Sequence, residues 1–431
     1  MTAGEKVDIG DKRSWLERAL AVTPGASQTR SKAPGVVGPL TGFPLVATRA
    51  DGAKVYTPDG KVFIDFCGAN AACTLGYAHR RITSAILDAA QTGVLLPLPA
   101  RDEAMVAEQL IEFVGFGEMV RFVKTGSEAM SAAVRLARAV TRRPIVLVAD
   151  HSYHGWHDWF QGRTHPETNP CEHDVQVWRN GIPASVGESI AVYRYADPDH
   201  ARVLIEMKRN EIAAVIIEPH RFMTDQRGII EGLHAIARAA EIPVIHDETV
   251  FGFRWARGGG HEFFETSTPD LAVFGKAMGN GVPIAAVVGS RRWMEPAAEF
   301  ISSTYGADRI GLLAACAVMQ VYQRDEVIGG LWEVGRAFWQ TFEATMDPIP
   351  GISGNVPVGR LEGFPVHFRF VSNVAGMDLD EVQRACARDG YLFHRSANNV
   401  NVAMTDEMVR TAATTLARAM NEAARVALAA A

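Results

Sequence analysis

The chain has few cysteines, few lysines, no excess of positive charge and no long apolar run. Its 431 residues carry 43 Lys plus Arg against 49 Asp plus Glu, a formal net charge of −6. Nucleic-acid binders rely on clustered positive charge, so this balance argues against a nucleic-acid partner. The longest apolar stretch, residues 311–322, is shorter than the roughly 20 residues of a membrane-spanning helix. It predicts a buried helix, and we expect no membrane partner.

The five cysteines are scattered along the chain and include no C-x-x-C pair. This pattern is typical of reduced thiols and argues against a disulfide framework or a structural zinc site. The first fifteen residues mix both charges and lack the apolar stretch of a secretory signal. We therefore expect a cytoplasmic protein.

Hydrophobic patterning divides the chain into three parts. Residues 1–60 form an N-terminal arm and the start of a hairpin, whose Asp59-Gly60 turn separates two alternating apolar runs. Residues 61–319 alternate apolar strands with helices and predict a large cofactor-binding domain. Residues 320–431 predict a smaller α+β domain that ends in a helix capped by Thr405.

The middle part predicts the fold class. Six mostly continuous apolar runs are the expected strands: residues 120–123, 144–149, 213–218, 243–247, 271–275 and 285–290. Strands of this kind, separated by helices, indicate an α/β fold with a mainly parallel, doubly wound sheet buried on both faces. Ligands of such sheets bind beyond the carboxyl ends of the strands. The residues that follow the runs are therefore the candidates for function.

Two of these strand ends carry groups that could bind parts of a charged heterocycle. Gly126 and Ser127 open a helix, where free backbone N–H groups, a hydroxyl and the helix dipole suit a phosphate. An ordinary helix cap is the alternative. Asp247 ends a buried run and needs a cationic or hydrogen-bonding partner. That partner is either an arginine or the protonated ring nitrogen of a ligand.

The segment HSYHGWHD, residues 151–158, has two interpretations. His151, His154, His157 and Asp158 could bind a metal, although Gly155 interrupts any helix and no recognised ligand spacing is present. We therefore assign no metal ligands. Alternatively, Tyr153 or Trp156 could stack on a planar ligand.

Lys276 stands out because lysine is rare. Only eight of the 43 basic residues are lysines, and Lys276 is the only one between Arg209 and the C-terminus. Unlike arginine, lysine can lose its proton near neutral pH and attack a carbonyl. Desolvation at the end of an apolar strand lowers its pKa and favours that reaction. The alternative is a surface lysine at the start of a glycine-rich loop.

Together, a phosphate site, an aromatic ring, a carboxylate and a lysine describe a pocket for pyridoxal 5′-phosphate (PLP). The chain also resembles the class III aminotransferases of fold type I, and most closely their glutamate-1-semialdehyde aminomutase-like branch. The motifs that carry this resemblance are TGSEAMSAAVRLAR (125–138), YHGWHD (153–158), IIEP (216–219), HDETVFGFR (246–254) and PDLAVFGKAMGNGVP (269–283). The resemblance implies a large, mainly parallel seven-stranded sheet and a smaller C-terminal domain.

The resemblance also implies roles for individual residues. Lys276 would form the internal aldimine with PLP, and Asp247 would pair with the pyridinium nitrogen. Around the cofactor, Gly126 and Ser127 would hold the phosphate, Tyr153 would stack on the ring and Thr249 would pack against it. Thr304 matches a threonine that reaches the phosphate of the neighbouring subunit, which implies a homodimer with shared active sites.

The substrate side is less specific. An arginine of the aminomutase's N-terminal arm binds the substrate carboxylate, and its place falls on Lys32, with Arg30 nearby. Trp156, Glu218 and Arg395 complete the candidate substrate contacts, and Arg395 could pair with a carboxylate. Phe251 and the sequence YGADRIG after Thr304 depart from the family pattern. These departures leave the substrate itself open.

The predicted function is a PLP-dependent aminotransferase that works by ping-pong exchange between an amino donor and a keto or aldehyde acceptor. An aminomutase of the glutamate-1-semialdehyde type, or an amino-acid racemase or epimerase, is the alternative on the same scaffold. A metal hydrolase, a nicotinamide dehydrogenase and a non-catalytic assembly subunit are the alternatives from other classes. The dehydrogenase is disfavoured because the glycine-rich loop 275–281 lacks the G-x-G-x-x-G spacing.

Overall fold

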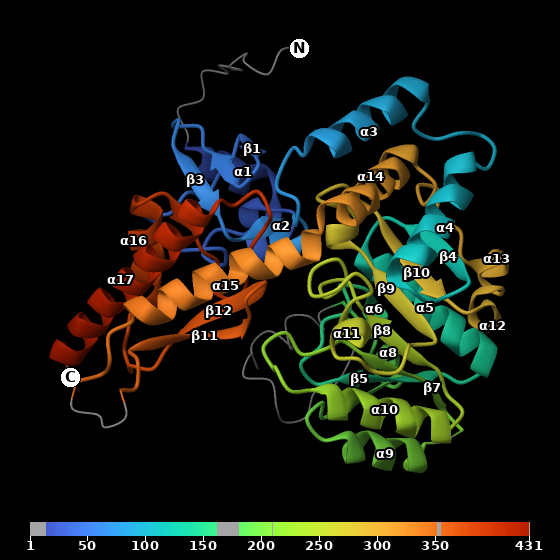
Figure 1. Ribbon diagram of the computed structural model, residues 1–431. Coiled ribbons are helices and arrows are strands. Elements are labelled where there is room, and N and C mark those ends of the chain that lie inside the picture. Colours follow the sequence, from blue (N-terminus) through green and yellow to red (C-terminus); the bar gives the residue numbers. More distant parts are fainter. Residues whose placement is uncertain (1–13, 162–180, 209, 351–354, 431) are drawn as a thin grey trace.

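The computed structural model describes residues 14–161, 181–208, 210–350 and 355–430 (Figure 1). Its central sheet has seven strands in the spatial order β4-β10-β9-β8-β7-β5-β6. These strands are β4 (Met119–Val123), β5 (Ile145–Ala149), β6 (Ile190–Tyr193), β7 (Ile212–Ile217), β8 (Val244–Asp247), β9 (Leu271–Phe274) and β10 (Ala285–Gly289). Only β10 runs antiparallel to its neighbours. The mainly parallel α/β sheet is thus confirmed.

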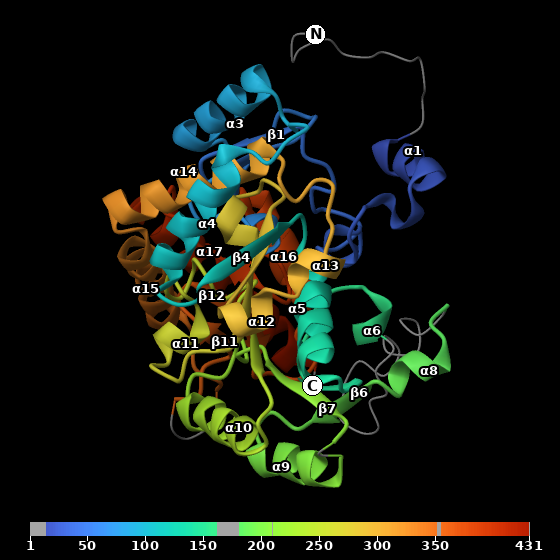
Figure 2. The same ribbon diagram turned by 90° about the vertical axis from the view of Figure 1, so that its right-hand side faces the viewer.

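The central sheet is covered on both faces, as continuous apolar strands require. Every residue of β5, β7, β8, β9 and β10 is buried. Helix α5 (Gly126–Thr141) packs on one face, and α9 (Pro198–Met207) and α10 (Arg227–Ala239) cover the other (Figures 1 and 2). The apolar run at 311–322 lies in α14 (Arg309–Asp325) and is largely buried, as predicted.

A second body of structure lies beside the central sheet (Figure 1). The three-stranded sheet consists of β11 (Gly359–Phe364), β12 (His367–Ser372) and β14 (Asn398–Asn399), and the helices of this region are α15 (Val327–Thr345), α16 (Leu379–Arg388) and α17 (Asp406–Ala430). Thr405 caps α17, because its hydroxyl accepts a hydrogen bond from the backbone N–H of Met408 at 3.3 Å. Residue 320 lies within α14, and the domain boundary placed there remains a prediction.

The N-terminal part forms its own small sheet. The strands β1 (Arg49–Asp51), β2 (Lys54–Tyr56) and β3 (Val62–Asp65) are joined by β13 (Tyr391–Leu392) from the C-terminal region. The predicted hairpin is present, since β2 and β3 pair antiparallel around Asp59-Gly60. The remaining helices are α1 (Trp15–Val22), α2 (Gly68–Ala71), α3 (Arg80–Thr92), α4 (Arg101–Val114), α6 (Asp158–Gln161), α8 (Ala184–Gly187), α11 (Gly260–Phe263), α12 (Arg291–Met294) and α13 (Ala297–Phe300), with short 3-10 turns η1 (Pro24–Ala26), η2 (Arg30–Lys32) and η3 (Lys276–Gly279). None of the described helices combines the length and apolar character needed to cross a bilayer.

The strand directions place the candidate residues together. Because only β10 is reversed, β4, β5, β7, β8 and β9 end at the same edge of the sheet. The segments that carry Gly126, Tyr153, Glu218, Asp247 and Lys276 begin at or directly after these ends. The fold therefore gathers at one edge residues that lie far apart in the sequence.

Candidate active site at the carboxyl edge of the sheet

A cavity of about 190 Å³ lies at this edge of the central sheet. Seven predicted site residues line it: Gly126, Ser127, Tyr153, Glu218, Asp247, Thr249 and Lys276. The other lining residues are His154, Gly155 and Val250. The structure thus brings together the four groups that were predicted to contact PLP, namely a helix N-terminus, an aromatic ring, a carboxylate and a lysine.

Asp247 is held by two hydrogen-bond partners at the end of β8. Its side chain is almost fully buried. One oxygen, Oδ2, lies 2.7 Å from Nδ1 of the buried His154, and the other accepts the backbone N–H of Thr249 at 3.1 Å. The carboxylate is therefore fixed in orientation, and each oxygen retains a lone pair for a further donor. Among the described residues, the partner of Asp247 is the imidazole of His154 and not the arginine that the sequence allowed. The pairing with a ligand's ring nitrogen stays a prediction.

The start of α5 leaves backbone donors free. Thr125 caps the helix by accepting the N–H of Glu128, while the Glu128 carboxylate accepts the N–H groups of Lys124 and Thr125. The N–H groups of Gly126 and Ser127 follow this cap and have no acceptor within the helix. Because both residues line the cavity, these donors suit a phosphate group.

Lys276 follows β9 and has a left-handed backbone, with φ of +46°. This conformation costs free energy for a residue with a side chain. Burial, together with the nearby positive charge of Arg221, lowers the pKa of the Lys276 amine from 10.5 to about 8. A much larger fraction of the amine is therefore neutral, and hence nucleophilic, at physiological pH than in an ordinary lysine.

This lowered pKa predicts the pH dependence of cofactor attachment. Only the neutral amine reacts with an aldehyde, so the rate at which the apoprotein takes up PLP should rise with pH and level off above a pKa of about 8. The rate can be followed by stopped-flow absorbance from pH 6 to 10. A rate that continues to rise up to pH 10 would show that Lys276 titrates as an exposed lysine.

The cavity wall depends on the absence of a side chain at Gly155. An added Cβ would lie 2.2 Å from Oγ and 2.8 Å from Cα of Ser127, and φ is +105°. Gly155→Ala should lower the free energy of unfolding by about 2–5 kcal/mol, from strained backbone plus overpacking. It should also weaken PLP binding at least about tenfold, because Ser127 is displaced. Chemical denaturation and PLP titration measure the two effects.

Gly60→Ala is the matched control, because Gly60 also has a positive φ, +83°, but open space around the added Cβ. It should cost about 1–2 kcal/mol for the backbone alone and leave PLP affinity unchanged. Equal losses in the two variants would mean that the contact with Ser127 is unimportant.

Glu218, which lines the cavity, forms an ion pair with Arg221 behind it. Glu218 is buried, and its Oε2 accepts the backbone N–H of Tyr153 at 2.7 Å. Its Oε1 accepts a hydrogen bond from Nε of Arg221 at 3.0 Å and a shorter one from Nη2 of the same residue. Burial raises the pKa of Glu218, but Arg221 and the nearby imidazoles outweigh this effect and hold the pKa below its usual range. The carboxylate is therefore ionised.

Two residues of this site were not predicted in these roles. His154 was considered as a metal ligand, but the structure places it against Asp247. Arg221 was not singled out at all. The signal for it was its position three residues after Glu218 in the segment that follows β7, a loop position where a side chain can reach the sheet edge.

Five predicted residues do not line this cavity. Thr304 lines a larger cavity of about 850 Å³ between α5 and residues 300–305. The Trp156 side chain is 69% exposed, although its backbone N–H donates to Ser127 Oγ. Arg30 and Lys32 lie exposed in η2. Arg395 is exposed and pairs with Asp380 at 2.9 Å.

The four candidate metal ligands of residues 151–158 have separate surroundings. His151 Nε2 lies 3.0 Å from the carbonyl oxygen of Glu218, and His154 contacts Asp247. His157 Nδ1 lies 2.5 Å from Ser131 Oγ, while Asp158 is exposed at the start of α6. The three imidazoles thus serve different parts of the structure.

The remaining unpaired atoms and gaps of the cavity fit PLP. Nε2 of His154 and Oγ1 of Thr249 are buried without a hydrogen-bond partner among the described residues. The glycines at 126 and 155 leave room beside Ser127 and Thr249 that a Cβ would fill. A phosphate at the start of α5, a ring beside Tyr153 and an aldehyde near Lys276 would use these features.

Comparisons with known proteins identify the family. Residues 39–359 match the family model for class-III aminotransferases. The chain is 30% identical over 353 residues to the 3-aminobutyryl-CoA aminotransferase of Cloacimonas acidaminovorans, covering 80% of each chain. It is 32% identical over 340 residues to the glutamate-1-semialdehyde 2,1-aminomutase of Hyperthermus butylicus, covering 77% of this chain and 78% of the relative.

The fold matches solved structures along nearly its whole length. The PLP internal aldimine form of the FumI protein of Sphingopyxis sp. MTA144 superposes with a TM-score of 0.82 at 24% identity, covering 95% of this chain and 96% of the other. This similarity confirms the α/β fold of the PLP transaminases. With a family match that spans most of the sequence, the chain belongs to the class-III aminotransferases, which use PLP as their cofactor.

Proposed function

We propose that the protein transfers an amino group from a small-molecule donor to a keto or aldehyde acceptor by ping-pong exchange. The observation that carries this proposal is the shared cavity of Lys276 and Asp247. PLP would supply an aldehyde that takes up the amino group and a ring that accepts electrons. The protein supplies a base, a fixed carboxylate and a phosphate site around it.

Each cavity residue has a separate task in this proposal. Lys276 holds the cofactor at rest and, when released, moves a proton to and from the substrate carbon as a general base and acid. Asp247 would accept a hydrogen bond from the protonated ring nitrogen of PLP, and His154 fixes the orientation of that carboxylate. The N–H groups of Gly126 and Ser127 bind the phosphate, while Tyr153 and Thr249 confine the ring.

The experiment that tests this proposal is a spectrophotometric screen of amino donors against the purified holoenzyme, without an acceptor. A productive donor should bleach the visible absorbance of the lysine-linked cofactor, and a keto acid or aldehyde should restore it. No change with any donor, or a colourless protein that does not bind PLP, would contradict the proposal.

An aminomutase is the second candidate, because one of the relatives described above is an aminomutase at 32% identity. An aminomutase returns the nitrogen to the same carbon skeleton, so free keto products do not accumulate. Lys32 and Arg30, which would take the place of the aminomutase's carboxylate-binding arginine, lie outside the described cavity in this subunit.

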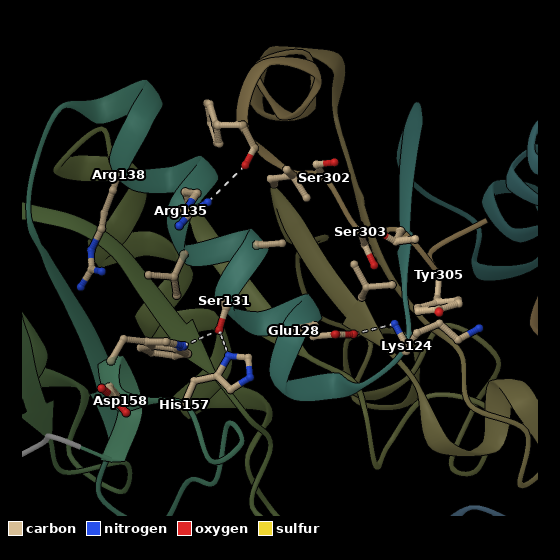
Figure 3. Close-up of a pocket in the computed structure, with 17 residues that line it drawn as sticks. Lys124, Glu128, Ser131, Arg135, Arg138, His157, Asp158, Ser302, Ser303 and Tyr305 are labelled. Carbon is tan, nitrogen blue, oxygen red and sulfur yellow. Dashed lines mark hydrogen bonds between the residues drawn. The ribbon is translucent and has the colours of Figure 1, made fainter. Parts of the chain in front are cut away.

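We also propose a homodimer in which the second subunit completes the site. Figure 3 shows Ser303 and Tyr305 on the other side of the larger cavity from Ser131 and His157, and the lining also includes Thr304. Large apolar side chains are exposed in the loop between α3 and α4, namely Leu95, Leu96 and Leu98. A hydrogen bond from the backbone N–H of Arg309 to the carbonyl oxygen of Val94 joins this loop to the start of α14. Exposed apolar surface of this kind is typical of subunit contacts.

Sedimentation of the holoenzyme tests the dimer. We expect a dimer at assay concentrations and, for Thr304→Ala, weaker PLP binding with the dimer retained. A monomer with full activity would contradict shared sites.

We also propose a cytoplasmic location. The described cysteines are free, which is in keeping with it.

A further inference from the structure

One guanidinium group, that of Arg221, lies behind the active-site cavity and contacts a residue that lines it. Glu218 lines the cavity together with Lys276, and Arg221 donates to Glu218 Oε1 at 3.0 Å. The positive charge of Arg221 also acts on Lys276, on Tyr153 and on His367. The geometry agrees, because Glu218 joins Arg221 to the backbone of Tyr153 and lines the same cavity as Lys276.

Arg221 has donors to spare. A guanidinium has five N–H groups, and both described contacts of Arg221 go to the same oxygen of Glu218. The Arg221 side chain keeps 29% of its surface exposed, whereas that of Glu218 keeps only 3%. Since the backbone N–H of Tyr153 fixes the other Glu218 oxygen, the carboxylate anchors Arg221 without saturating it.

Other candidate cations are bound to groups elsewhere or make no described contact with a residue that lines the cavity. Arg254 is fully buried, and its two Nη atoms donate to three backbone carbonyl oxygens. Arg395 pairs with Asp380 on the surface. Lys32 is exposed, and its described hydrogen bond, to the carbonyl oxygen of Thr29, does not reach a residue that lines the cavity. Among the residues that the structure describes, Arg221 is thus the best placed to meet a substrate anion.

Strand β12 of the three-stranded sheet contacts the residue that follows Arg221. Phe222 stacks against His367 of β12 with ring centroids 5.8 Å apart, and Arg369 lies 4.5 Å above the Phe222 ring. His367 is buried, and its Nε2 has no partner among the described residues. Residues 221–222 therefore lie between the cavity and β12. The unpaired Nε2 of His367 is a further polar atom in this place.

We propose that Arg221 binds a carboxylate of the substrate and thereby selects donors or acceptors that carry a carboxylate over those that lack one. The guanidinium bridges two carboxylates, that of Glu218 and that of the substrate, through charge-assisted hydrogen bonds. This inference rests on the proposed aminotransferase function and assigns a substrate class to it. Arg221 is a specificity-determining residue in this account, and Glu218 positions it.

The test compares donors that differ only in a carboxylate. Alanine and isopropylamine form one pair, and β-alanine and propylamine form another; in each pair a methyl group replaces the carboxylate. For Arg221→Met, the second-order rate constant of cofactor bleaching by the acidic donor should fall about 10- to 100-fold, since a charged hydrogen bond is lost. The rate constant of the matched amine should change less than about threefold. Arg221→Lys should retain part of the preference.

A binding measurement keeps the test independent of turnover and folding. Propionate, as a carboxylate probe, should bind the wild-type holoenzyme at least about tenfold more tightly than Arg221→Met in calorimetry. Arg221→Met leaves Glu218 buried and unpaired, so the double variant Glu218→Gln/Arg221→Met provides a neutral pair and should show the same selective loss. Equal losses for acids and amines, or a wild-type enzyme that reacts only with amines, would overturn the proposal. A wild-type protein that takes up no PLP would instead overturn the proposed function.

Discussion

Lys276→Ala should lower amino-group transfer at least about 10⁴-fold, because both the attacking amine and the proton-transfer group are lost. The visible absorbance of the lysine-linked cofactor should disappear as well. Steady-state assays and absorbance spectra of the purified variant measure the two effects. A variant that kept either the absorbance or substantial turnover would remove Lys276 from the chemistry.

Peptide mapping distinguishes Lys276 from a second lysine with a lowered pKa. Burial lowers the pKa of Lys124 to about 8 too, but Lys124 pairs with Asp308 and lines the larger cavity. After borohydride reduction, the cofactor should be attached to the peptide that contains Lys276. Lys61→Ala, which removes an exposed lysine paired with Asp59, is the control for general effects and should leave activity unchanged.

Asp247→Asn should lower the rate of proton transfer about 100- to 1,000-fold, the usual range for losing one preorganised electrostatic contact. The amide has the shape of the carboxylate but no negative charge, so the ring nitrogen of PLP loses the group that favours its protonation. PLP should still bind, because Lys276 and the start of α5 are intact. Single-turnover kinetics with a deuterated donor would report the proton-transfer step.

A cofactor analogue tests the reason for this loss. PLP methylated at the ring nitrogen carries a fixed positive charge and should restore part of the rate of Asp247→Asn. Asp270→Asn is the matched control, since Asp270 is a half-buried carboxylate that accepts the N–H of Val244 at the opposite edge of the sheet. It should affect stability more than rate. If the two variants lost activity alike, the charge at Asp247 would have no special role.

The sequence predicts the central sheet well because its strands are continuous apolar runs. Five of the six predicted runs became strands whose every residue is buried, and the other is β4. Strand β6 was missed because its four residues, Ile190–Tyr193, form only a short apolar segment at the sheet edge. Edge position weakens the pattern, since such a strand is only half covered: its central residues are partly exposed.

The site is predictable where a residue's role depends on its place at a strand end. Lys276 and Asp247 meet this condition, and both line the cavity. Contacts between residues far apart in the sequence cannot be predicted in this way. His154 and Asp247 are 93 positions apart, and their contact depends on the order of strands in the sheet. Arg221 belongs to a loop, and its direction is set by Glu218, which no periodicity reveals.

The most direct test of amino-group exchange is a single turnover without an acceptor. Holoenzyme mixed with a productive amino donor should release one keto product per active site, with loss of the visible absorbance, and then stop until a keto acid or aldehyde is added. Lys276→Ala should release none. An enzyme that rearranged or epimerised the donor catalytically, with no free keto product, would contradict the account.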